Sequence, residues 1–164
     1  MPFTNVNIHF VWSTKNRIPY LHSKNLRMTV WDHIQENAKK KKIWIDTING
    51  YHDHSHALIF LEFNQTMSQI MQLIKGESSF WINKNKLCRN KFEWQEEYYA
   101  VSVSPSQLDQ VREYIRNQEE HHRHKSFQEE FDQFISKCGF QKFSDGSIKT
   151  VGALASREER FSFE

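Results

Sequence analysis

The chain has 164 residues, of which 38% are hydrophobic and 14% aromatic, and its formal net charge is only +2. These values are typical of one globular domain with a sizeable core, and they exclude an intrinsically disordered polymer. No apolar run approaches the length that spans a bilayer, and the N-terminus lacks the basic and apolar regions of a signal peptide. Cys88 and Cys138 lie far apart without a CxxC motif. We therefore expect reduced thiols and a cytoplasmic protein.

The charges are segregated along the chain although their sum is small. Residues 15–42 carry eight basic side chains against two acidic ones, and residues 84–91 carry four basic side chains and no acid. The acidic residues gather later, between positions 119 and 132. Such segregation permits a basic face that binds a polyanion, with solvated helix surfaces as the alternative interpretation.

The first part of the chain predicts a strand, a helix and a strand hairpin. Residues 5–14 alternate and are rich in β-branched and aromatic side chains, which predicts a first strand. A loop around Pro19 follows, and residues 24–42 carry apolar side chains at helical spacing. Residues 43–50 and 54–63 predict two strands joined by a short turn, which makes them antiparallel.

A second helix and a fourth strand follow. Thr66 and Gln69 have the spacing of a capping box, and the helix that they open reaches Trp81. Residues 84–93 form a polar, basic connector, and residues 98–103 predict the fourth strand.

Two more helices are expected near the C-terminus. The run Ser104-Pro105-Ser106-Gln107 is typical of a helix start, and this helix covers about residues 105–122. Another helix covers about residues 126–139. We expect residues 1–143 to form one domain and residues 144–164 to form a polar tail of unknown role.

The predicted order of elements is β-α-β-β-α-β followed by two helices. This order is the split βαβ arrangement of ferredoxin-like and RRM-like domains, so we expect an α+β fold with an antiparallel sheet. Helices would cover one face of the sheet and leave the other face free for a partner or a ligand.

The run His52-Asp53-His54-Ser55-His56 leads into the third predicted strand. Side chains two apart on a strand point to the same face, so His54 and His56 would stand side by side. Two parallel imidazoles are half of a divalent-metal site. The chain has nine histidines, so such pairs also arise by chance. We interpret His52 as a turn residue, and His122 and His124 as solvated.

Tyr114 and Gln118 lie four residues apart on a predicted helix, beside the buried stripe that contains Ile115. One interpretation is a boundary tyrosine and a solvated glutamine. The other makes Tyr114 a nucleophile. A free phenol is only about 0.1% ionised at pH 7, so it would need a proton acceptor or a target polarised by a metal. Gln118 could add an oxygen ligand of the kind that suits Mg²⁺ or Mn²⁺.

Five segments stand in order over about residues 5–122: FVWSTKNR (10–17), DHSHALI (53–59), IKGESS (74–79), WQEEY (94–98) and YIRNQEEHH (114–122). Together they resemble the single-tyrosine HUH transposases, which include the IS200/IS605-like and the REP-associated tyrosine transposases. One departure is Ser55, because the family usually has a bulky aliphatic residue between the two histidines. The side chain of Ser55 should face away from the metal, toward the helices.

The resemblance implies a metal-dependent transposase and endonuclease that cleaves and rejoins single-stranded DNA next to hairpins. His54, His56 and Gln118 would hold Mg²⁺ or Mn²⁺. Tyr114, carried by the C-terminal helices, would attack a phosphodiester to form a 5′-phosphotyrosine and release a 3′-OH. Such enzymes typically act as homodimers, in which the tyrosine helix of one subunit can complete the site of the other.

This resemblance also gives the surface residues a role. The aromatic residues Trp94, Tyr98 and Tyr99 could stack on unpaired bases, with core packing as the alternative. Tyr98 and Tyr99 are rival nucleophiles, which we rank below Tyr114 because neither shares a helical face with a ligand. The basic candidates for phosphate contacts are Lys15, Arg17, Lys75, Lys84, Lys86, Arg89 and Lys91.

A function from a different class is an alternative. The same fold could bind single-stranded nucleic acid or repeat hairpins through its sheet without cutting, as a non-catalytic or domesticated module.

Overall fold

The computed structural model describes residues 1–145 and 147–150, and the chain divides into two compact units, Met1–Arg123 and His124–Glu164. The boundary that the sequence predicts, after residue 143, does not coincide with this division. The helix expected over 126–139 belongs to the second unit, because it packs on the strand that follows it.

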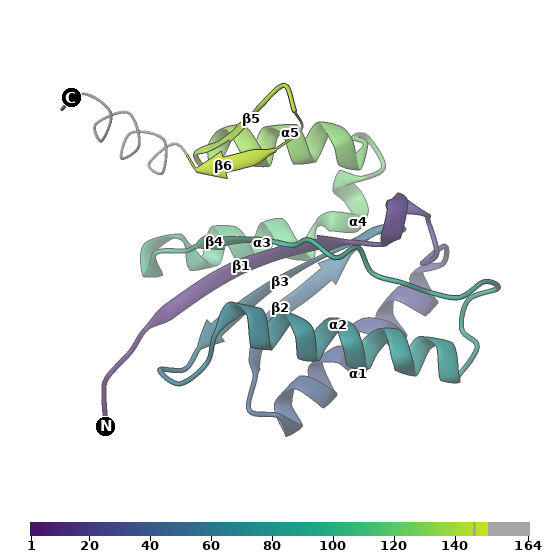
Figure 1. The fold of residues 1–164 in the computed structure, drawn as a ribbon, viewed down its shortest axis with the longest axis horizontal. Coiled ribbons are helices and arrows are strands. Elements are labelled where there is room, and N and C mark those ends of the chain that lie inside the picture. Colours follow the sequence, from purple (N-terminus) through teal and green to yellow (C-terminus); the bar gives the residue numbers. More distant parts are fainter. Residues whose placement is uncertain (146, 151–164) are drawn as a thin grey trace. The chain divides into compact units, whose positions relative to one another are not determined.

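The first unit has the expected β-α-β-β-α-β order, followed by shorter helices (Figure 1). Its main elements are β1 (Val6–Ser13), α1 (Lys24–Lys40), β2 (Trp44–Gly50), β3 (His54–Leu61), α2 (Met67–Lys84), β4 (Tyr99–Ser102), α3 (Leu108–Arg116) and α4 (Gln118–His121). Two 3₁₀ turns complete it, η1 (Lys15–Arg17) and η2 (Pro105–Gln107).

The strands form one antiparallel sheet in the order β2-β3-β1-β4, which confirms the α+β, ferredoxin-like prediction. β1 lies between β3 and β4, and its register pairs Val11 with His56 and Ser13 with His54. The β2–β3 hairpin contains a register shift between Ile45 and Thr47. The first half of β3 therefore lies beside the second half of β1, at one end of the sheet.

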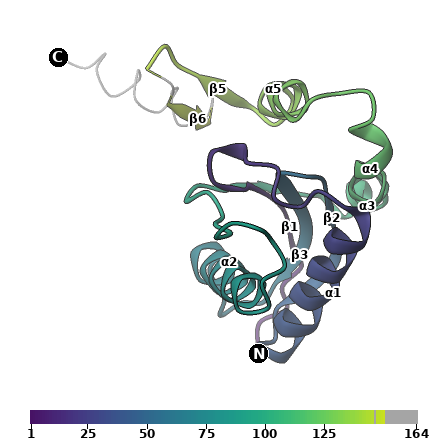
Figure 2. The ribbon, with the colours of Figure 1, turned by 90° about the vertical axis from the view of Figure 1, so that its right-hand side faces the viewer.

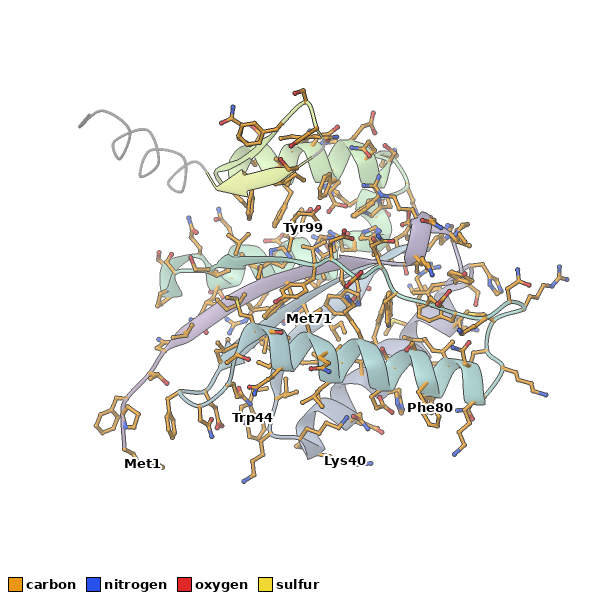
Figure 3. The ribbon with its side chains drawn as sticks, in the orientation of Figure 1. Met1, Lys40, Trp44, Met71, Phe80 and Tyr99 are labelled. Carbon is orange, nitrogen blue, oxygen red and sulfur yellow. The ribbon has the colours of Figure 1, made fainter. Side chains whose placement is uncertain are left out.

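Helices α1 and α2 lie side by side over one face of the sheet (Figure 2). Alternation along the strands sends Phe10 and Trp12 of β1 and Ala57 of β3 to this face, where all three are buried. Met71 reaches from α2 toward the sheet and is buried, whereas Phe80 points outward from the same helix (Figure 3). The main core of the unit is therefore the layer between the sheet and these two helices.

The prediction that the opposite face of the sheet is free was wrong. Leu58 of β3 and Ile115 of α3 are fully buried in one small apolar cluster, so α3 covers part of this face. The reason is the apolar stripe on α3, which has to be buried against another element. The predicted helix over 105–122 is also interrupted, since Asn117 separates α3 from α4 with ψ at 12°.

The second unit consists of α5 (Phe127–Lys137) and the hairpin of β5 (Phe140–Lys142) and β6 (Ile148–Thr150). A capping box of Ser126 and Glu129 begins α5. The tail predicted from residue 144 contains β6, and its residues 146 and 151–164 lie outside the described residues.

Within residues 1–145 and 147–150, no helix combines the length and the apolarity that crossing a bilayer requires. Both cysteines are free thiols, and burial raises the pKa of each.

Candidate active site

His54 and His56 begin β3, directly after the tight turn of the hairpin. Tyr51 donates its backbone N–H to the carbonyl oxygen of His54 at 3.0 Å, and a Cβ at Gly50 would collide with that oxygen. Only glycine therefore fits position 50. The two imidazoles project to the face away from α1 and α2, with ring centroids 5.2 Å apart. This is the side-by-side arrangement that the strand period predicts.

The orientation of His54 is set by its neighbour. Its Nδ1 lies 2.8 Å from the carboxylate Oδ1 of Asp53. A carboxylate only accepts, so Nδ1 carries the proton and Nε2 keeps its lone pair when the ring is neutral. That Nε2 lies 3.2 Å from Oε1 of Gln118. Two electron-pair donors thus converge, and the donor set fits a cation between them.

The orientation of His56 is set across the sheet. Its Nδ1 lies 3.0 Å from Nε2 of His9, a buried residue of β1 on the same face. When His56 donates this hydrogen bond, its Nε2 keeps the lone pair that a metal needs. His9 was not among the candidate residues predicted from the sequence. The signal was present in the alternation of β1, which places His9 and Val11 on the face of the sheet that carries the histidines.

Helix α3 is tied to β2 of the same chain. The guanidinium of Arg112 donates to both carboxylate oxygens of Asp46, at 2.8 and 3.1 Å, and Asn49 donates to the carbonyl oxygen of Arg116 at 3.0 Å. Burial of the Asp46 carboxyl opposes its ionisation, but the hydrogen bonds and charge of Arg112 outweigh this and lower its pKa. These contacts fix the helix that carries Tyr114.

Helix α4 is tied to α1 by a second arginine. Arg27, only 4% exposed, donates to both carboxylate oxygens of Glu119, at 2.7 and 2.8 Å, and to the carbonyl oxygen of Leu21 at 2.7 Å. Its guanidinium also lies 4.9 Å from the ring centre of Tyr51. A bidentate arginine pair holds a definite geometry. It therefore positions Gln118, the residue next to Glu119.

His122 was interpreted as solvated, and this interpretation was wrong. Its Nε2 lies 3.1 Å from Oε1 of Gln118, and its ring centre lies 4.5 Å from that of His54. The signal was in the sequence, because Tyr114, Gln118 and His122 follow one another at intervals of four residues. The amide oxygen of Gln118 therefore lies within hydrogen-bonding distance of ring nitrogens of both His54 and His122.

Tyr114 lies beside this group. Its ring centre is 5.6 Å from that of His56, 6.1 Å from that of His9 and 5.5 Å from that of His121. The rival Tyr98 packs instead against Phe10, on the face of the sheet that α1 and α2 cover. The structure thus brings Tyr114, His54, His56 and Gln118 together from separate parts of the chain.

The environment of Tyr99, the other rival, argues against it as the nucleophile. Burial raises the pKa of the Tyr99 phenol, and the nearby carboxylate of Glu97 raises it as well. A higher pKa leaves less phenolate at neutral pH.

The basic candidates lie mostly on two adjoining loops. Thr14 bridges to Trp94, and Lys15 donates its backbone N–H to the carbonyl oxygen of Glu93 at 2.9 Å. The first loop also reaches the histidine turn, since Thr14 donates to the carbonyl oxygen of Asp53 at 2.8 Å. Arg17, Arg89 and Lys91 lie on these loops, Lys84 and Lys86 lie at the end of α2, and Lys75 lies apart in the middle of α2.

The model of the family described as "Transposase IS200 like" matches residues 2–118. A structure of a Deinococcus radiodurans R1 protein described as a transposase is similar, with a TM-score of 0.58 and 19% identity. That similarity covers 71% of this chain and 93% of the other. A REP-associated tyrosine transposase bound to a REP hairpin is also similar, with a TM-score of 0.55 and 16% identity over 74% of this chain and 72% of the other. No curated protein matches the sequence.

The fold and the grouped side chains define an α+β domain with histidines on the sheet and a tyrosine on a following helix. The family match covers more than half of the chain, and the protein belongs to the IS200-like transposase family. Membership supports a function in DNA transposition and recombination, and it implies DNA strand transfer in general. The two solved structures show the shared fold.

Proposed function

We propose that this protein is a metal-dependent transposase of the HUH type that cleaves and rejoins single-stranded DNA next to hairpins. The observation that carries the proposal is the meeting of Tyr114 with His54, His56 and Gln118 on one side of the sheet. The similar tyrosine transposase bound to a REP hairpin supports the choice of hairpin DNA.

In this proposal His54, His56 and Gln118 would hold Mg²⁺ or Mn²⁺, and His122 would be an additional neighbour. Asp53 and His9 hold the two imidazoles so that each presents Nε2. An amide and imidazoles that bind through their lone pairs are neutral ligands, so they would leave a bound ion its positive charge to attract the DNA phosphate. When bound, the divalent cation supplies Lewis-acid polarisation of a phosphate oxygen.

Tyr114 is the nucleophile. Its phenolic oxygen loses its proton to solvent and attacks phosphorus, and the bond between phosphorus and the 3′ oxygen breaks. The 3′ oxygen takes up a proton and leaves as a 3′-OH, while the 5′ phosphate stays on Tyr114. The phosphotyrosine is itself a phosphodiester, so another DNA 3′-OH can reverse the attack without an external energy source.

The adjoining basic loops lead the strand to the site. Lys15, Arg17, Arg89 and Lys91 contact phosphates, and the hydrogen bond from Thr14 to Asp53 joins these loops to the histidine turn. Such binding weakens steeply as salt rises.

A covalent-adduct assay tests this function. Hairpins from the DNA that flanks the coding sequence, with their unpaired flanks, are labelled at the 3′ end and incubated with protein and Mn²⁺. We expect a denaturation-resistant labelled protein band, because the downstream strand stays on Tyr114. The same DNA labelled at the 5′ end should yield a shortened free strand.

Matched variants identify the residues involved. Tyr114→Phe and removal of metal with EDTA should each abolish the band, His56→Ala should behave like EDTA, and Tyr99→Phe should retain the band. An adduct that survives in Tyr114→Phe would refute the nucleophile. DNA binding by the wild type without any adduct would favour the second candidate, a non-catalytic module that binds single-stranded DNA or repeat hairpins.

A further inference from the structure

Two segments with no role at the candidate active site line one pocket. Residues 74–79 lie on α2, and residues 94–98 precede β4. Together they line most of an open pocket of about 510 Å³, with Lys75, Gly76, Ser79, Trp94, Gln95 and Tyr98 among its residues. Pockets of this size bind small organic groups. None of the metal-site residues lines this pocket.

Two of the lining residues, Trp94 and Tyr98, are aromatic, and packing holds both rings in place. Trp94 packs edge-on against Trp12 with ring centres 5.9 Å apart, and its indole N–H donates to Oγ of Ser78 at 2.9 Å. Tyr98 packs against Phe10 at 6.0 Å. Trp94 is only 8% exposed, so the half-buried ring of Tyr98 offers the flat apolar surface, at little cost in side-chain entropy.

Gly76 lines the pocket and has no side chain to fill it. It lies in the middle of α2, where glycine is less favourable than alanine. Leaving out the backbone of the helix itself, no heavy atom lies within 4 Å of the place that a Cβ would take. Packing within this unit therefore gives no reason for glycine here. A ligand that approaches the helix backbone would give one.

Both positively and negatively charged residues line the pocket. Nζ of Lys75 donates to the carbonyl oxygen of Glu96 at 2.6 Å and lies 6.0 Å from the ring centre of Tyr98. An ammonium group has further protons to donate. Glu93 and Glu96 also line the pocket, and the negative charge of their side chains disfavours an anion inside it, although Glu93 is paired with Lys15 at 3.4 Å. The occupant should therefore be neutral and flat, with both acceptors and N–H groups at its edge.

A nucleobase has this chemistry. We propose that the pocket takes one unpaired base of single-stranded DNA, stacked on Tyr98 and hydrogen-bonded to Lys75, while the sugar-phosphate chain stays outside. Stacking of unpaired bases on aromatic side chains is a general mode of single-strand recognition. This inference rests on the proposed function, because it requires that the chain handles unpaired DNA.

Fluorescence anisotropy measures DNA binding by the pocket separately from DNA cleavage. The full chain is titrated against a fluorescein-labelled, randomised 20-nucleotide single-stranded DNA in EDTA. Gly76→Leu fills the pocket from its open side and should raise the Kd fivefold or more, which is the loss of about one stacked base. Gly76→Ala adds one methyl group beside the helix backbone, so it should raise the Kd, but by less than Gly76→Leu does. Gln69→Leu, at an exposed position of α2 outside this pocket, should stay within twofold of the wild type.

A crosslink locates the base. The same DNA containing 4-thiothymidine, irradiated at long wavelength, should crosslink to the peptide with Trp94 and Tyr98, and Gly76→Leu should remove this crosslink. An unchanged Kd in Gly76→Leu, or crosslinks only elsewhere, would overturn the inference. So would a wild type that does not bind the DNA. The adduct assay with Tyr114→Phe is read separately, so either proposal can fail alone.

Discussion

His9 on β1 and His56 on β3 are joined across the sheet by a hydrogen bond of 3.0 Å between Nε2 and Nδ1. Both side chains are at least 94% buried, so the bond is shielded from water. It gives His56 a fixed ring orientation, as Asp53 does for His54. The two candidate metal ligands thus have different supports, an imidazole for one and a carboxylate for the other.

His9→Ala should weaken metal binding although His9 is not itself a ligand. Loss of such a supporting partner typically lowers metal affinity by about 10–100-fold. Isothermal titration with Mn²⁺ measures this. His9→Gln keeps a hydrogen-bonding group near the position of Nε2 and should recover most of the affinity. Equal affinity in His9→Ala and the wild type would show that His56 does not need this support.

Arg27→Met should destabilise the docking of α4. The substitution removes two hydrogen bonds to Glu119 and one to Leu21, and it leaves the carboxylate of Glu119 without this cation. A hydrogen-bonded charged group contributes about 1.5–3 kcal/mol, and the carboxylate of Glu119, 24% exposed, regains water, so we expect a loss of about 2–3 kcal/mol in the free energy of unfolding. Urea denaturation measures the loss. In the Glu119→Gln background Arg27→Met should cost less, and equal costs in both backgrounds would argue against coupling.

The expected homodimer is not needed to bring the site residues together. Arg112 and Arg27 hold α3 and α4 on the β2 and α1 of their own chain. A mixture of Tyr114→Phe and His56→Ala proteins should therefore form no DNA adduct, because each chain lacks one part of its own site. Recovery of adduct in the mixture would show that the tyrosine helix acts in the partner's site.

The ion pair between Asp46 and Arg112 should make stability depend on pH. The folded-state pKa of Asp46 lies below its unfolded value of about 3.9, so the stabilisation is complete well above pH 4 and is lost as pH falls through the folded pKa. Asp46→Asn should unfold more easily than the wild type at pH 7, by about 1 kcal/mol. In urea denaturation this difference should shrink toward pH 2–3. A difference that persists there would exclude the carboxylate charge as its source.

Ser55→Ala should stabilise the protein. The side chain of Ser55 is fully buried, and its Oγ has no hydrogen-bond partner among the residues that the structure describes. Removal of such a hydroxyl should raise the free energy of unfolding by about 1 kcal/mol, visible as a higher Tm. Ser55 alternates with the two histidines and so points toward α1 and α2. Adduct formation in Ser55→Ala should therefore be unchanged. A lower Tm in this variant would instead imply that the hydroxyl of Ser55 forms a hydrogen bond.

The order of elements could be predicted from the sequence because it depends on local patterns. Period-two alternation in β1 and β3 and helical spacing in α1 and α2 are each readable within one segment. The same local rule placed His54 beside His56, and Tyr114 with Gln118 on one helical face. Local rules were less reliable at the helix break at Asn117, where tertiary contacts set the backbone.

The meeting of these segments depends on tertiary structure. No local rule indicates that Arg27 pairs with Glu119, that His9 supports His56, or that His122 reaches Gln118, because these residues meet only after α3 and α4 dock on the sheet. Docking buries the apolar stripe of α3, and long-range burial of this kind is not encoded in any one window of sequence. The residues able to hold a metal were thus present in the sequence, whereas their geometry was decided by the fold.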